Sequence, residues 1–393
     1  MSDTPSKPFR TPWPGSVSRP VVNPLQPSVV YASDDPDALD AQYEGGAKGF
    51  TYAREGHPNA EVLGQMVDAM EGAKGGVVTG SGMGAVTVAL LGTVRAGDHV
   101  LGADQLYGRS LRLMNEELPR LGIATSLADP TDVAAFEAAI RPETRLILIE
   151  TVSNPTLRVA DVDGIIAMAL ARGVLVAVDN TFPTPRGCQP LARGADIVIH
   201  SVTKLMAGHS DATLGYVAAR DPDLAARFLT LAVSMGFTAS PFDCWLAERG
   251  LYSFDLRYER CTATAARLGD ALADMPGVER VLYPARSDHP DHNRSISLLG
   301  GEGGHMVSFE IAGGRAGANA FVRAAEGLNF APTLGDIATT ISHPATSSHR
   351  ALTPEARAAL GISEGFFRIS VGCEPADALI ATFDTAVRAA CEV

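Results

Sequence analysis

The sequence is poor in cysteine, in long apolar runs and in positive charge, and each scarcity excludes a class of protein. Five cysteines are spread over 393 residues without a C-x-x-C pair, so we expect neither a disulfide framework nor a metal site. No run of about 18 apolar residues occurs, which argues against a membrane-spanning helix. Residues 1–14 are polar and proline-rich and lack the apolar core of a secretion signal. We therefore expect a cytoplasmic protein.

The scarcity of positive charge restricts the partners. Lysine and arginine number 32 against 45 aspartate and glutamate residues, a formal net charge of −13 at pH 7. Nucleic acids and anionic membrane surfaces bind basic patches, so we expect neither as a partner. The remaining composition, 46% hydrophobic and 20% charged, is ordinary for a large globular protein and predicts one large domain plus a smaller one.

Sequence patterns divide the chain into three parts. Residues 1–60 are rich in proline and glycine with little periodicity, so we expect an arm that lies on another surface. In residues 61–255, short apolar runs alternate with helical patterns, which predicts an α/β fold with a mostly parallel sheet covered on both faces. Residues 256–393 begin with a long helical stretch and are predicted to form a smaller α+β domain with its own sheet.

Polar residues stand where several of the predicted strands end. Asn154 follows one strand, Asp179 ends the next, and Ser201, Thr203 and Lys204 follow a third. Ligands of parallel sheets bind at the carboxyl ends of the strands. A single polar residue at a strand end is usually structural, but several that face a common crevice predict a binding site.

Lys204 has two interpretations. It follows the buried run 197–199, and burial of an unpaired ammonium costs free energy. A desolvated lysine has a lowered pKa and attacks aldehydes, which would make Lys204 a nucleophile that forms a Schiff base. Alternatively, its side chain extends to the surface at the strand end. This stretch by itself leaves both interpretations open.

Two further segments are suited to a phosphate. A glycine-rich turn at 80–82 leads from a short strand into a helix, where free N–H groups favour an anion, although the same turn could simply connect the two elements. Tyr52 and Arg54 are two residues apart, so they share one face of an extended strand. They could grip a phosphate or belong to a solvated loop.

Arg368 lies between large apolar residues on a predicted strand. A buried arginine needs an anionic partner, either an internal Asp or Glu or the carboxylate of a substrate. Together, the lysine, the strand-end aspartate, the glycine-rich turn and the buried arginine fit pyridoxal phosphate. The aldehyde of this cofactor needs a lysine, and its pyridine nitrogen needs a carboxylate that keeps the ring an electron sink. Arg368 would then hold the carboxylate of an amino-acid substrate.

The sequence resembles the Cys/Met-metabolism family of fold-type I pyridoxal-phosphate enzymes, the group of cystathionine γ-synthase, cystathionine γ-lyase and methionine γ-lyase. The resemblance runs from about Phe50 to Val371 and covers nearly the whole chain. So many ordered motifs make the match highly specific. They are residues 52–54, 81–84, 106–108, 150–156, 178–182, 194–198, 200–204, 208–211, 343–345 and 368–372.

This resemblance implies a role for each residue that would bind the cofactor. Lys204 would form the Schiff base and later carry protons among Cα, Cβ and Cγ of the substrate, and Asp179 would pair with the pyridine nitrogen. Tyr107 would stack on the ring and take part in proton transfer. The phosphate would be held by Gly82, Met83, Ser201 and Thr203.

Other implied roles concern the substrate and the assembly. Asn154, Thr333 and Arg368 would hold the substrate carboxylate. Tyr52 and Arg54 would reach the phosphate site of the neighbouring subunit, which would make the active site a product of the dimer. The family is typically a homotetramer built from two such dimers, so the resemblance implies a homotetramer here.

The expected activity is a pyridoxal-phosphate-dependent elimination or replacement at Cβ or Cγ of a sulfur-containing amino acid or an activated homoserine. A cystathionine γ-lyase- or γ-synthase-like enzyme of transsulfuration is the first expectation, and an O-acylhomoserine sulfhydrylase or a methionine γ-lyase is the alternative. A pyridoxal-phosphate aminotransferase of the same fold would be a different class, but the motifs match the elimination family throughout.

Four residues leave the substrate open. Pro332 stands where the cystathionine γ-enzymes carry a Glu for the distal ammonium, and Thr333 replaces the usual Ser. Arg109 stands where methionine γ-lyases carry Cys, which counts against that activity. Arg112 matches an arginine that serves the distal part of the substrate in the cystathionine γ-enzymes, unless it is a solvated helix residue. Arg112 therefore favours a polar distal group, and Pro332 opposes one that a Glu recognises.

Overall fold

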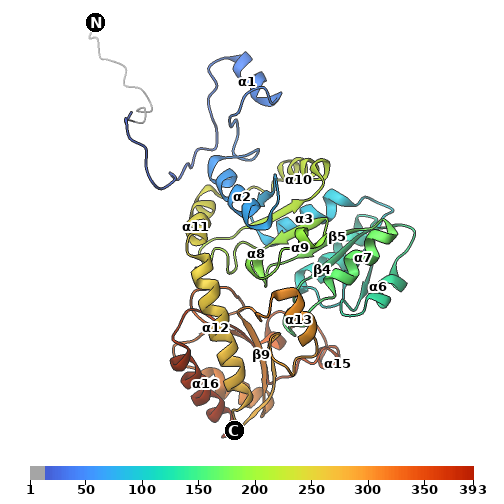
Figure 1. Ribbon diagram of the computed structural model, residues 1–393, viewed down its shortest axis with the longest axis vertical. Coiled ribbons are helices and arrows are strands. Elements are labelled where there is room, and N and C mark those ends of the chain that lie inside the picture. Colours follow the sequence, from blue (N-terminus) through green and yellow to red (C-terminus); the bar gives the residue numbers. More distant parts are fainter. Residues whose placement is uncertain (1–13) are drawn as a thin grey trace.

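The computed structural model describes residues 14–393, so the first part of the predicted arm, residues 1–13, lies outside the described residues. The chain forms a seven-stranded sheet and a five-stranded sheet. The long helix α12 (Phe254–Ala273) runs from the part of the molecule that holds the first sheet into the part that holds the second (Figure 1). None of the described helices is long and apolar enough to cross a membrane.

The larger sheet is mostly parallel, as the alternating pattern predicted. Its order is β1-β7-β6-β5-β4-β2-β3, and only the pairs that β7 forms with β1 and β6 are antiparallel. Most of these strands are continuous apolar runs because both faces are buried. Their bounds are β1 (Val77–Thr79), β2 (His99–Ala103), β3 (Ala124–Ala128), β4 (Thr144–Glu150), β5 (Leu175–Asp179), β6 (Ile197–His200) and β7 (Gly215–Ala219).

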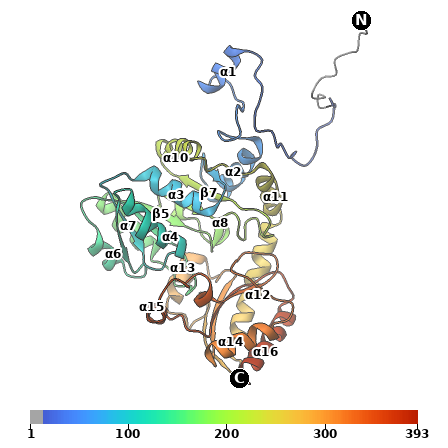
Figure 2. The same ribbon diagram turned by 180° about the vertical axis from the view of Figure 1, so that it is seen from behind.

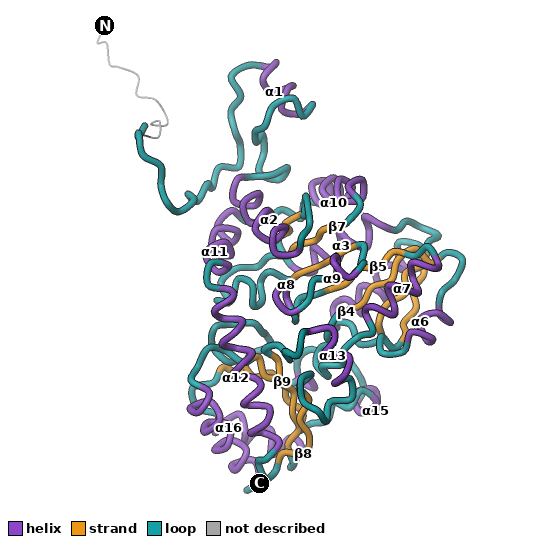
Figure 3. The backbone as a smooth tube through the Cα atoms, viewed as in Figure 1, coloured by secondary structure: helices purple, strands orange, loops and turns teal. Residues whose placement is uncertain are grey.

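Helices cover this sheet on both faces (Figure 3). Successive residues of a strand point to opposite faces, and along β6 they enter two different apolar clusters. Ile197 and Ile199 join the cluster that contains residues of α3 and α10, whereas Val198 joins the cluster of α2, α11 and α12. The helices are α2 (Pro58–Glu71), α3 (Gly82–Thr93), α4 (Gly108–Arg112), α5 (Leu118–Arg120), α6 (Val133–Ala139), α7 (Val162–Arg172), α8 (Thr184–Gly187), α9 (Pro190–Arg193), α10 (Pro222–Met235) and α11 (Pro241–Leu251).

The smaller sheet has the order β10-β11-β12-β9-β8 and a core rich in phenylalanine. The rings of Phe309, Phe321, Phe367 and Phe383 pack against one another, mostly edge-on or tilted, with centroids 4.8–6.1 Å apart. The strands are β8 (Val278–Leu282), β9 (Met306–Ile311), β10 (Asn329–Phe330), β11 (Thr340–Ser342) and β12 (Phe366–Ser370). The helices that follow α12 are α13 (His292–Leu299), α14 (Gly314–Ala324), α15 (Pro354–Ala359) and α16 (Ala376–Cys391).

The described part of the arm extends from the body of the molecule and carries the short helix α1 (Pro36–Tyr43), as two opposite views show (Figures 1 and 2). Near its base, Asn23 is tied to α11, because its side chain donates to Glu248 and its backbone carbonyl accepts from the indole N–H of Trp245. On the N-terminal side of Asn23, Val17 and Val21 are fully exposed.

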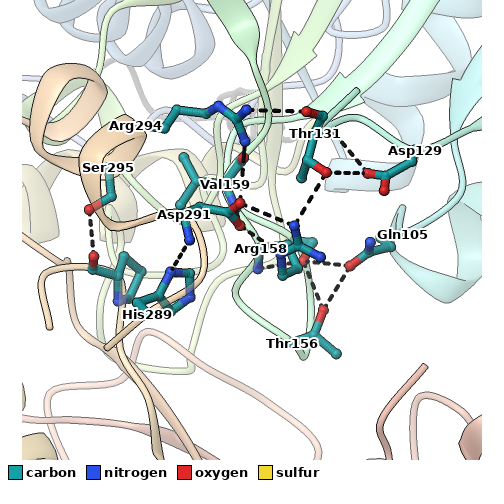
Figure 4. Close-up of polar contacts among 12 residues, drawn as sticks. Gln105, Asp129, Thr131, Thr156, Arg158, Val159, His289, Asp291, Arg294 and Ser295 are labelled. Atoms are coloured by element: carbon teal, nitrogen blue, oxygen red, sulfur yellow. Dashed lines mark hydrogen bonds and ion pairs between the residues drawn. The ribbon is translucent and has the colours of Figure 1, made fainter. Parts of the chain in front are cut away.

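An ion-pair network ties α13 to the loop that follows β4 (Figure 4). Arg158 donates Nε to Asp291 Oδ2 at 2.6 Å and Nη2 to Oδ1 at 3.1 Å, and the backbone N–H of Val159 donates to Oδ2 at 3.0 Å. Arg294 of α13 also contacts this loop, because its Nη1 donates to the carbonyl of Val159 as well as to Asp291 Oδ1. The side chain of Asp291 is only 5% exposed. The network therefore fixes the loop that carries Asn154 against the C-terminal part of the chain.

Removal of the Asp291 carboxylate should destabilise the fold. Asp291→Ala leaves the half-buried guanidinium of Arg158 without its partner, so we expect a loss of roughly 2–4 kcal/mol in the free energy of unfolding. Burial alone would raise the pKa of Asp291, but the hydrogen bonds from Arg158 and Val159 outweigh it and hold the pKa below its ordinary value. This stabilisation is therefore present at neutral pH and is lost as the pH falls through that lowered pKa.

Urea unfolding of both Asp291→Ala and a matched surface variant tests this expectation. Glu137→Ala removes the partner of Arg172 in an ion pair whose side chains are 48% and 53% exposed. It should change the stability by less than about 1 kcal/mol. Equal losses in the two variants would contradict a structural role for Asp291.

Candidate active site

Lys204 lies in a turn directly beyond β6, at the carboxyl edge of the larger sheet. Its backbone N–H donates to Ser201 O at 3.1 Å, and its carbonyl accepts from the N–H of Gly208 at 2.8 Å. The side chain is largely buried. Burial, followed by the positive charge of Arg368, lowers the pKa of the Lys204 amine. A larger fraction of the amine is therefore neutral and nucleophilic than in an ordinary lysine.

The glycine-rich turn forms a cradle beside Ser201. Ser81 caps α3, because its Oγ accepts from the N–H of Gly84 at 3.0 Å. A Cβ on Gly82 would lie 2.7 Å from both Cβ and Oγ of Ser201, so only glycine lets the helix N-terminus come this close. Met83 is the second residue of α3. Free N–H groups, the helix dipole and a hydroxyl thus converge, which is the donor set that a phosphate needs.

Thr203 lies in the same turn, but the chain uses its hydroxyl. Thr203 Oγ1 donates to the carbonyl of Leu214 at 3.1 Å and accepts from the N–H of Leu214 at 2.8 Å. These two bonds hold the segment before β7 against the turn of Lys204. A contact between Thr203 and a phosphate remains a prediction.

Asp179 ends β5 and is held by Thr181. Its Oδ1 accepts from the backbone N–H of Thr181 at 3.1 Å and from the hydroxyl at 2.6 Å. The same hydroxyl accepts from the N–H of Ser201 at 2.9 Å. Burial raises the pKa of Asp179, while the bonds from Thr181 and the nearby His200 oppose that rise. A cationic group such as a protonated pyridine nitrogen would stabilise the ionised form of this carboxyl further.

Arg368 is buried on β12 with neutral partners. Nη1 donates to Oδ1 of Asn154 at 2.7 Å, Nη2 donates to the backbone carbonyl of Thr333 at 2.8 Å, and Nε has no partner among the described residues. Burial lowers the pKa of Arg368 to about 10, against an opposing effect of Tyr107. Two anionic partners were predicted for this arginine, an internal carboxylate or that of a substrate. The described residues provide no internal carboxylate, so a substrate carboxylate remains the predicted partner.

Glu150 is a site residue to which sequence reasoning assigned no role. It ends β4 directly opposite Asp179 on β5, and Oε1 accepts from the backbone N–H of Tyr107 at 2.5 Å. The N–H groups of Tyr107 and Asn154 lower its pKa, but burial and then the charge of Asp179 raise it well above the ordinary value. Glu150 therefore positions the backbone of Tyr107, a predicted site residue. Its place at a strand end was the signal that could have identified it.

The segment 331–340 packs against the backbone of the Lys204 turn at Gly335. Gly335 has a φ of +79°, and a Cβ there would lie 2.3 Å from the backbone N of Leu205. Pro332 is exposed at the start of this segment. The carbonyl of Thr333, rather than its hydroxyl, contacts Arg368.

Three of the predicted site residues form no hydrogen bond or ion pair with the residues around Lys204, Asp179 and Arg368 in the described part of the chain. Arg112 is 58% exposed and pairs with Glu116 at 2.8 Å, as a solvated helix residue would. Tyr52 and Arg54 lie side by side, with the guanidinium 5.5 Å from the ring centroid. They line a cavity of about 500 Å³ together with residues 25, 27, 29 and 238–242. Neither Lys204 nor Asp179 lines that cavity.

The fold and this site define a class of protein, an enzyme that binds an aldehyde cofactor with a phosphate group at the carboxyl edge of an α/β sheet. Residues 14–388 match the profile of the Cys/Met metabolism PLP-dependent enzyme family, and the chain belongs to that family. Its cofactor is pyridoxal phosphate, and the family and its named relatives are carbon–sulfur lyases or γ-synthases. The residues described above fit this cofactor in their chemistry, with an amine of lowered pKa, a buried carboxyl group, and a helix N-terminus that meets the hydroxyl of Ser201 at Gly82.

Several relatives are similar over most of their length. The chain is 38% identical to O-succinylhomoserine sulfhydrylase of Pseudomonas aeruginosa, covering 86% of this chain and 84% of that one. It is also 38% identical to a cystathionine beta-lyase of Bacillus subtilis, covering 86% of each. The crystal structure of cystathionine gamma synthase from Xanthomonas oryzae, in complex with cystathionine, is 36% identical, with a TM-score of 0.89 over 95% of this chain and 94% of that chain. These similarities identify transsulfuration-type chemistry and leave the particular reaction open.

Changes at Glu150 test its positioning role. Glu150→Gln keeps an oxygen that accepts from Tyr107, so we expect kcat/KM to remain within about threefold of the wild type. Glu150→Ala leaves that N–H unpaired and should lower kcat/KM by roughly ten- to hundredfold, as an unpaired buried donor costs about 1–3 kcal/mol. Steady-state kinetics should be measured beside cofactor content and thermal unfolding. Equal activity of both variants, with full cofactor content, would contradict the role.

The pH dependence of cofactor capture tests the electrostatics of Lys204. Attack on the aldehyde needs the neutral amine, so the rate at which apoprotein captures pyridoxal phosphate should rise with pH through a midpoint below 10.5, the ordinary lysine value. Arg368→Leu removes a positive charge that lowers the pKa of Lys204 and should move the midpoint upward. Stopped-flow absorbance follows this step without substrate. Identical midpoints in the two proteins would contradict the coupling.

Proposed function

We propose that the protein catalyses elimination or replacement at Cγ of an L-amino acid, as a cystathionine γ-lyase- or γ-synthase-like enzyme. The observation that carries this proposal is the contact of Arg368 with Asn154, because a buried cation with neutral partners is suited to a substrate carboxylate beside Lys204. Binding through this carboxylate would orient Cα of the substrate toward the amine of Lys204.

In the proposed reaction, each residue has a limited task. Pyridoxal phosphate, when bound, supplies the electron sink for carbanion chemistry. Asp179 would pair with the ring nitrogen, and Arg368 and Asn154 would hold the substrate carboxylate. Lys204 would hold the cofactor through its amine and, when that amine is free, would accept the proton from Cα and carry protons among Cα, Cβ and Cγ of the substrate. Tyr107, held by Glu150 through its backbone, would lie against the ring.

We further propose a homotetramer made of two dimers that share active sites. Tyr52 and Arg54 are exposed on one side of the arm and are separate from the site that contains Lys204 in the same chain. They would complete the phosphate site of the neighbouring subunit. The fully exposed Val17 and Val21 support this assembly, since a second subunit would bury them.

A second candidate is an O-acylhomoserine sulfhydrylase, and Pro332 favours it. The segment 331–340 contains a single carboxylate, Asp336, and its Oδ1 accepts from the N–H of Ala338 within the segment. The segment therefore has no carboxylate at position 332, where the cystathionine γ-enzymes carry the Glu for the distal ammonium. A substrate with a neutral or anionic distal group, such as an acylated homoserine, avoids that need. Arg109 in place of a cysteine makes a methionine γ-lyase the weaker alternative.

A substrate panel tests these alternatives. The panel is cystathionine, methionine, cysteine, and O-acetyl- and O-succinylhomoserine, each with and without added cysteine or sulfide. We expect release of the γ-substituent from cystathionine or an acylhomoserine, measured as 2-oxo acid, as a new thioether when cysteine is added, or as a new thiol amino acid when sulfide is added. Lys204→Ala should abolish both this activity and the visible absorption of the lysine-bound cofactor. A 2-oxo acid that retains its γ-substituent would indicate amino transfer and contradict the proposal.

A further inference from the structure

Two free thiols are in contact far from each other in sequence. Cys261 lies in α12 and is fully buried, and Cys373 lies just after β12 and is partly accessible. Their Sγ atoms are 3.7 Å apart. A disulfide bond needs a separation of about 2 Å, so a shift of less than 2 Å between the two side chains would allow it.

The surroundings of Cys373 favour its thiolate. The hydrogen bond from Cys261 and the guanidinium groups of Arg257 and Arg260 lower the pKa of Cys373 to about 7, against the opposing effects of burial and Glu374. Redox-sensitive cysteines are typically accessible thiolates in an electropositive environment with a second thiol nearby. Cys373, with Cys261 as the second thiol, meets these conditions, whereas Cys391 is exposed and has no second thiol beside it among the described residues.

We propose that Cys373 and Cys261 form a redox modification site that takes a hydroperoxide. The thiolate of Cys373 attacks one oxygen of the peroxide, the O–O bond breaks, and the leaving oxygen takes up a proton, which leaves a sulfenic acid on Cys373. The thiol of Cys261 then attacks this sulfur, and the hydroxyl leaves as water with the proton of Cys261. The two thiols thus give up two electrons and the peroxide is reduced.

The modification would act on the segment 331–340. The backbone N–H of Cys373 donates to the carbonyl of Ile337 at 2.8 Å, and the N–H of Ile337 donates to the carbonyl of Gly208 at 2.8 Å. Glu374 also accepts from the backbone and hydroxyl of Thr339. A movement of Cys373 would therefore be transmitted through this segment to the turn that contains Lys204.

The other thiol is fixed more firmly. One turn before Cys261 in α12, Arg257 donates to the carbonyls of Leu205 and Met206 at 2.6 and 3.0 Å. We therefore expect closure of the bond to move Cys373 rather than the helix and to shift the segment 331–340 relative to Lys204. On this basis, which rests on the proposed function, the oxidised enzyme should have a several-fold lower kcat/KM, and a thiol reductant should restore it.

Peroxide titration of the holoenzyme tests the site. Peptide mapping after treatment with hydrogen peroxide should show peptides that contain Cys261 and Cys373 linked within one chain, and dithiothreitol should separate them. In Cys261→Ser, Cys373 should instead accumulate a sulfenic acid that dimedone traps. Cys373→Ser should form no link, and the control Cys391→Ser should behave as the wild type.

Different outcomes overturn different parts of the inference. Oxidation confined to Cys391, or irreversible oxidation of Cys373 in the wild type without a link to Cys261, would overturn the site. A link that forms without any change in kcat/KM would overturn its effect on the active site. If the reduced enzyme is inactive on the whole substrate panel but the link still forms, the proposed function fails while the redox site stands.

Discussion

The site depends on the alignment of the parallel strands at one edge of the larger sheet. Glu150 at the end of β4 lies opposite Asp179 at the end of β5, and Asp179 lies opposite Ile199, just before the turn of Lys204. The strands end together because their register is set by apolar residues buried on both faces. A one-residue slip in any of them would turn a polar end residue toward the opposite face of the sheet.

Charges of the same sign lie near one another in this site. Arg368 lowers the pKa of Lys204, and Asp179 raises the pKa of Glu150. Such arrangements cost stability in the protein alone, but a substrate carboxylate beside Arg368 and a cationic ring nitrogen beside Asp179 would compensate them. The phenylalanine core behind β12 and the Asp291 network supply stability elsewhere. The site is thus prepared for ligands of a definite charge.

The segment 331–340 connects the two halves of the molecule. It follows β10 of the smaller sheet, accepts from Arg368 through Thr333, and packs Gly335 against the backbone after Lys204. Residues 372–374, which include Cys373, form hydrogen bonds with the same segment. Substrate recognition and the redox chemistry proposed for the two thiols therefore involve one short stretch of backbone.

The sequence by itself determined the fold class, the parallel strands and the cofactor chemistry, because these follow from local patterns and from residue types at strand ends. It also predicted that Lys204, Asp179, Asn154 and Arg368 belong to one site. Only the tertiary structure decided which groups touch. Examples are the bonds of Arg368 to its neutral partners, the bond of Glu150 to the N–H of Tyr107, and the contact of Cys261 with Cys373. These contacts join residues 35 to 214 positions apart in the sequence. No local pattern encodes such contacts, because they arise from the packing of one sheet and its helices against the other.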